Sequence, residues 1–68
     1  MSEQIFTVTG MTCGHCVQSV TEEVGAVAGV TGVEVDLPTG KVTVRAAEEI
    51  AIADVRAAVE EAGYQLTA

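Results

Sequence analysis

The segment Gly10-Met11-Thr12-Cys13-Gly14-His15-Cys16 holds both cysteines, the only histidine and one of the two methionines of the chain. A run rich in β-branched residues precedes this segment, and an apolar stripe with helical spacing follows it. We therefore expect a loop that joins a strand to a helix. The remaining residues form a small scaffold that holds this loop at one edge.

The residues on either side of the loop predict a strand and a helix. Residues 4–9 combine β-branched and aromatic side chains and place Phe6 and Val8 on one face, which is typical of a strand. The helix is expected from Gly14 or His15 to about residue 27. Its apolar stripe consists of Val17, Val20, Val24 and Val27.

The second half of the chain predicts a hairpin, a helix and a short last strand. Residues 30–37 and 41–45 alternate apolar with polar side chains, and a turn containing Pro38 joins them. A helix is expected over residues 52–62 and a strand over residues 64–67. The stripe of this helix consists of Ile52, Val55, Val59 and Ala62.

The predicted order of elements is β-α-β-β-α-β, the split βαβ pattern. Right-handed crossovers would place both helices on one face of a four-stranded antiparallel sheet. We therefore expect an α+β fold, a ferredoxin-like sandwich. Sixty-eight residues leave no room for a second domain, so residues 1–68 are predicted to form one domain.

The charge of the chain narrows the choice of partners. A formal net charge of −7 argues against nucleic acid and anionic membrane surfaces, which attract basic patches. An acidic surface either keeps the protein soluble or docks onto a basic partner. No apolar run is long enough to span a bilayer, and no signal peptide is visible. If residues 1–68 are the whole protein, we expect it to be cytoplasmic.

The two cysteines have the spacing of a metal site. In the cytoplasm thiols stay reduced, so a C-x-x-C pair there indicates metal binding or catalysis rather than a disulfide. Cys13 in the loop and Cys16 in the first helical turn can face a common point, and the helix N-terminus favours their thiolate forms. Two thiolates suit Cu(I), whereas structural zinc prefers four protein ligands, which this chain alone does not offer.

The wider string Gly-Met-Thr-Cys-x-x-Cys-Val, residues 10–17, resembles the metal loop of the heavy-metal-associated domain family. Residues 29–37, 40–44 and 60–64 resemble the second strand, the third strand and the end of the second helix of that family. The family occurs in copper chaperones and in the N-terminal modules of copper-transporting P-type ATPases. The resemblance covers almost the whole chain and implies a ferredoxin-like fold.

The resemblance also implies the site. Cys13 and Cys16 would bind Cu(I) and pass it by ligand exchange to a P-type ATPase metal-binding domain or entry site. Met11 is expected beneath the loop in the core, and Tyr64 falls where bacterial cytosolic copper chaperones place a tyrosine beside the metal. His15 is either an exposed loop residue or an auxiliary group that tunes the thiols or binds additional Cu(I).

Several alternatives remain open at this point. The chain could be an excised ATPase module or a carrier of zinc, cadmium or mercury, although a start at Met1 favours a free-standing protein. Tyr64 could cover the core edge, and a Cu(I)-bridged homodimer could form through surface thiolates. A dithiol redox protein is the remote alternative, because Pro38 lies in a hairpin turn and cannot face the cysteines. No catalytic site is expected, so the chain is predicted not to be an enzyme.

Overall fold

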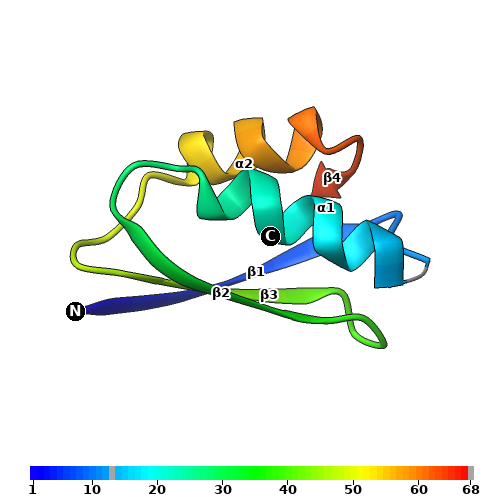
Figure 1. Ribbon diagram of the computed structural model, residues 1–68, viewed down its shortest axis with the longest axis horizontal. Coiled ribbons are helices and arrows are strands. Elements are labelled where there is room, and N and C mark those ends of the chain that lie inside the picture. The colour runs from blue at the N-terminus through cyan, green and yellow to red at the C-terminus, as the bar shows by residue number, and fades with distance from the viewer. Residues whose placement is uncertain (13, 68) are drawn as a thin grey trace.

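The six elements follow one another in the predicted order β-α-β-β-α-β (Figure 1). The structure, a computed structural model, describes residues 1–12 and 14–67. The strands and helices are β1 (Ser2–Thr9), α1 (Gly14–Gly25), β2 (Val30–Asp36), β3 (Lys41–Ala46), α2 (Ile52–Glu61) and β4 (Gln65–Leu66).

The strands form one antiparallel sheet in the order β2-β3-β1-β4. Val42 of β3 lies opposite Phe6 of β1 on one side and opposite Val35 of β2 on the other. β4 pairs with the end of β1, where Leu66 lies opposite Val8. Both helices cover the same face of this sheet (Figure 1), and the predicted ferredoxin-like α+β fold is confirmed.

The core between the two layers is built mainly from valine. The fully buried side chains are Val20, Val24, Val42, Val44, Val55 and Val59. Phe6 and Val8 complete the core from β1, as their shared face predicted. The inward residues of β2 are only half-buried, because β2 is an edge strand and pairs with another strand on one side only.

The helices differ from the prediction in the end of α1 and in the buried face of α2. α1 ends at Gly25, two residues before the predicted end, and the next turn closes with a bond from the Val27 N–H to the Val24 carbonyl of 3.1 Å. The prediction that Ile52 belongs to the buried stripe of α2 is wrong, since this side chain is 47% exposed. The buried face of α2 consists of Val55, Ala58 and Val59.

Ile50 fills the place that was predicted for Ile52. The side-chain amide of Gln4 on β1 forms two hydrogen bonds with the backbone of Ile50. The Ile50 N–H donates to Gln4 Oε1 at 2.7 Å, and Gln4 Nε2 donates to the Ile50 carbonyl at 3.0 Å. These two bonds hold the connector 47–51 so that the Ile50 side chain turns inward and is buried. Ile52, at the start of α2, is left facing solvent.

The turn between β2 and β3 lies close to β1. The Val8 N–H donates to the Gly40 carbonyl at 2.8 Å, and Gly40 has a φ of +73°. A side chain at Gly40 would place its Cβ 2.5 Å from the Val8 carbonyl oxygen, so only glycine fits this approach. Within the described residues, no helix is long and apolar enough to cross a membrane.

Candidate metal centre

The loop after β1 begins with a glycine that a tyrosine covers. Gly10 has a φ of +97°, a conformation that residues with side chains rarely adopt. A Cβ at Gly10 would lie 3.2 Å from Cδ1 of Tyr64, so the tyrosine ring lies directly against the glycine backbone. Tyr64 follows α2, and its N–H donates to the Val59 carbonyl at 3.1 Å. Two segments far apart in the sequence therefore meet at the start of the loop.

Cys16 lies in the first turn of α1 and is half-buried. Its Sγ lies 3.9 Å from Thr12 Oγ1, within hydrogen-bonding range for sulfur, and either group can donate. Thr12 precedes the helix by two residues, so the loop and the first turn hold each other through this contact. Cys13, the other predicted ligand, lies outside the described residues.

The other two predicted residues of the loop, Met11 and His15, differ in how far they are buried. Met11 is half-buried and packs against the core, which agrees with the role expected for it beneath the loop. His15 is exposed, and its carbonyl accepts a bond of 3.2 Å from the Ser19 hydroxyl one turn later. His15 therefore lies at the surface, one residue before Cys16 in the sequence.

The start of α1 provides a favourable electrostatic environment for a thiolate. The first turn of the helix contains no acidic side chain, so the partial positive charge of its N-terminus is not neutralised there. Cys16 lies within this turn, where the helix dipole favours negative charge on sulfur. Within residues 1–12 and 14–67, no group of three or more His, Cys, Asp or Glu side chains is placed so that it could hold a metal ion.

Sequence reasoning assigned no role to the Thr12 hydroxyl. The spacing of four residues between Thr12 and Cys16 is the signal that could have revealed it, because such a spacing brings side chains together at a helix start. The packing of Tyr64 on Gly10 depends on how α2 is placed against the sheet, so local sequence alone does not predict it.

Comparisons with known proteins bear on this loop. A family model described as the heavy-metal-associated domain matches residues 5–65. The copper chaperone CopZ of Staphylococcus aureus is 37% identical over 67 residues, which cover 97% of this chain and 98% of that protein.

Two solved structures show the same similarity in three dimensions. A structure described as CopZ metallochaperone matches with a TM-score of 0.90 and 34% identity, covering 97% of this chain and 100% of that one. The N-terminal domain of a potential copper-translocating P-type ATPase from Bacillus subtilis, in its Cu(I)-loaded state, matches with a TM-score of 0.82 and 29% identity. That match covers 94% of this chain and 81% of the other.

Proposed function

Because this chain belongs to the heavy-metal-associated domain family, we propose that it is a copper chaperone that binds Cu(I) through Cys13 and Cys16. It is a metal carrier and not an enzyme. The relatives named copper chaperones match nearly the full chain, which favours copper over zinc, cadmium or mercury and disfavours a redox role.

One observation carries the assignment of the ligands. Cys16 is half-buried in the first turn of α1, beside the Thr12 hydroxyl and at the end of the helix that favours a thiolate. Cys13, three residues earlier, is proposed as its partner ligand from the sequence spacing. A pair of thiolates suits the soft, low-coordinate Cu(I) ion.

The proposed transfer is a ligand exchange. A thiolate of the partner forms a bond to the two-coordinate Cu(I), which gives a three-coordinate intermediate. One of the two cysteine thiolates then leaves the ion, a second partner thiolate takes its place, and the remaining bond breaks. Copper stays Cu(I) throughout, and no free ion is released.

We propose a P-type copper ATPase as the acceptor, through its cytoplasmic metal-binding domain or its entry site. The similarity in fold to the Bacillus subtilis ATPase domain supports this choice, because two domains of one fold can present matching loops to each other. The proposed compartment is the bacterial cytoplasm, where both thiols stay reduced. We also propose that two copies of the chain can share Cu(I) in a metal-bridged homodimer when no acceptor is present.

An anaerobic Cu(I) titration against a competing chelator tests the proposal. The reduced protein is compared with the double variant Cys13→Ser plus Cys16→Ser, and Zn(II) is titrated in parallel. Tight Cu(I) binding that disappears in the variant, with much weaker zinc binding, is expected. Weak Cu(I) binding, or a variant that binds equally well, would overturn the proposal. A stoichiometry above one copper per chain would bring His15 forward as an additional ligand.

A further inference from the structure

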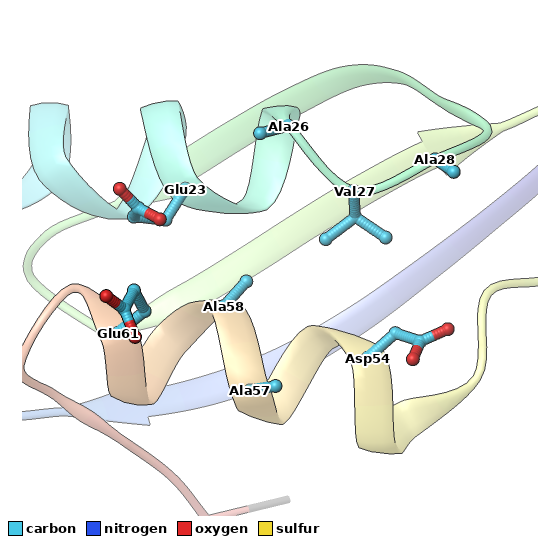
Figure 2. Close-up of a pocket in the computed structure, with 8 residues that line it drawn as sticks. All are labelled: Glu23, Ala26, Val27, Ala28, Asp54, Ala57, Ala58 and Glu61. Atoms are coloured by element: carbon cyan, nitrogen blue, oxygen red, sulfur yellow. The ribbon is translucent and has the colours of Figure 1, made fainter.

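A groove runs between the two helices on the side away from the sheet (Figure 2). It has a volume of about 480 Å³. Its apolar lining consists of Ala26, Val27, Ala28, Ala57 and Ala58. These side chains are small, so an occupant can approach the backbones of both helices closely.

Three carboxylates line the same groove. Figure 2 shows Glu23 of α1 and Glu61 of α2 facing each other from opposite helices at one end, with Asp54 at the other end. Among the described residues, no cation forms an ion pair with any of the three, since the ion pairs found there join Arg45 to Glu3 and Glu34 on the sheet. The groove therefore presents negative charge that this fold leaves uncompensated.

The groove continues past the helices. A second hollow shares Ala28 and Asp54 with it and extends over the connector 47–51, where Glu48 and Glu49 add two more carboxylates. Figure 1 shows this connector at the end of the molecule opposite the loop that precedes α1. The end of the groove at Asp54 and the connector therefore lies away from the candidate metal loop.

We propose that this groove docks a basic segment of a partner protein, one that carries lysine or arginine residues beside small apolar side chains. The cations would pair with the carboxylates along the rim, and the small side chains would pack on the alanine floor. A second copy of the chain is a poor occupant, because it brings a net charge of −7 to a negative surface. The proposal goes beyond the copper function, since it requires neither copper nor the cysteines.

Binding of a defined peptide to the reduced, copper-free protein tests the proposal. The probe is a short helical peptide of Lys-Ala-Ala repeats, and a Gln-Ala-Ala peptide serves as the neutral control. Calorimetry gives the affinity, and NMR amide shifts give the place of binding. The lysine peptide is expected to shift amides of α1 and α2 along the groove, and to bind less tightly as salt is added.

A matched pair of variants separates the groove from overall charge. Glu23→Gln plus Glu61→Gln removes the two facing carboxylates, whereas Glu22→Gln plus Glu60→Gln removes the same charge one residue earlier on each helix. The first double variant is expected to bind the peptide roughly fivefold more weakly, which corresponds to about 1 kcal/mol, and the second to change little.

A third variant tests the apolar floor without changing any charge. Ala57→Leu keeps a strong helix former in α2 and fills the groove, so it should also weaken peptide binding. Equal weakening by both glutamate double variants, shifts centred on residues 10–16, or self-association through the groove would each overturn the proposal. All three variants should bind Cu(I) as the parent does, so a failure here is distinguishable from failure of the copper function.

Discussion

The ring of Tyr64 rests on the backbone of Gly10, with Cδ1 only 3.2 Å from the position that a Cβ on the glycine would occupy. This contact joins the end of α2 to the start of the candidate metal loop. Because Gly10 also has a φ of +97°, a side chain there would meet both a strained backbone and a ring in the way. The loop conformation therefore depends on two residues from opposite ends of the chain.

We expect Gly10→Ala to destabilise the protein by about 1–3 kcal/mol, because alanine rarely adopts this φ and its methyl group would push on Tyr64. Urea unfolding of the copper-free protein measures the effect. Gly25→Ala is the matched control, since Gly25 has no atom within 4 Å of an added Cβ and no positive φ. The control should be neutral or slightly stabilising, and equal losses in both variants would contradict this account.

The Thr12 hydroxyl is expected to support Cys16 through their 3.9 Å contact. Thr12→Val keeps the shape of the side chain and removes the hydroxyl, which should weaken Cu(I) binding by about two- to fivefold, given a weak exposed hydrogen bond. Competitive Cu(I) titration measures the change. Thr12→Ser retains the hydroxyl and should stay close to the parent, so a serine variant as weak as the valine variant would argue against the hydrogen bond.

The two bonds between Gln4 and Ile50 are expected to stabilise the start of α2. Gln4→Ala removes both and should lower the free energy of unfolding by about 2 kcal/mol. Gln18→Ala is the control, because Gln18 makes only an exposed contact of 3.5 Å to Glu22, and it should change stability by no more than about 0.5 kcal/mol. Copper affinity should be unchanged in both, since neither residue lies at the loop.

The ion pairs of Arg45 are expected to contribute little. Hydrogen bonds from Arg45 to Glu34 and Glu3 raise the pKa of its guanidinium above the usual value, so the stability linked to this group is present at neutral pH and is lost as the pH rises through that raised pKa. All three side chains are about half exposed or more, so water and salt screen the attraction. Arg45→Met should leave the urea midpoint almost unchanged across the neutral pH range. A clear drop that disappears at high salt would contradict this expectation.

The periodicity of the sequence is sufficient to predict the order of the elements. It does not predict the burial of every apolar side chain, and the structure shows why. The valine stripe of α1 and the alternation in β3 depend only on neighbours along the chain, so Val20, Val24, Val42 and Val44 are buried as predicted. The prediction for Ile52 was wrong because the burial of Ile50 depends on Gln4, which lies 46 residues away.

For the candidate site, too, the sequence predicts some features, and others depend on how distant segments pack. The loop could be located from the sequence, because the cysteine spacing lies where a strand pattern gives way to a helix pattern. Cys13 lies outside the described residues, so the pair of ligands stays a prediction. The groove beside Ala57 and Glu23 could not be predicted, since it exists only where the end of α1 and the residues that follow it lie beside α2.

The two layers of the fold also divide the charge of the molecule. Lys41 and Arg45 lie on β3 in the sheet, where they offset the acidic side chains of β1 and β2. The helices and the connector carry the other seven acidic residues and a single basic residue, Arg56 on α2; the acidic residues are Glu22, Glu23, Glu48, Glu49, Asp54, Glu60 and Glu61. The negative charge is therefore concentrated on the helical side of the molecule. Its electric field favours encounters in which a basic partner approaches that side. Such steering acts mainly on the association rate, so added salt should lower the association rate more than it raises the dissociation rate, and the affinity should fall chiefly for that reason.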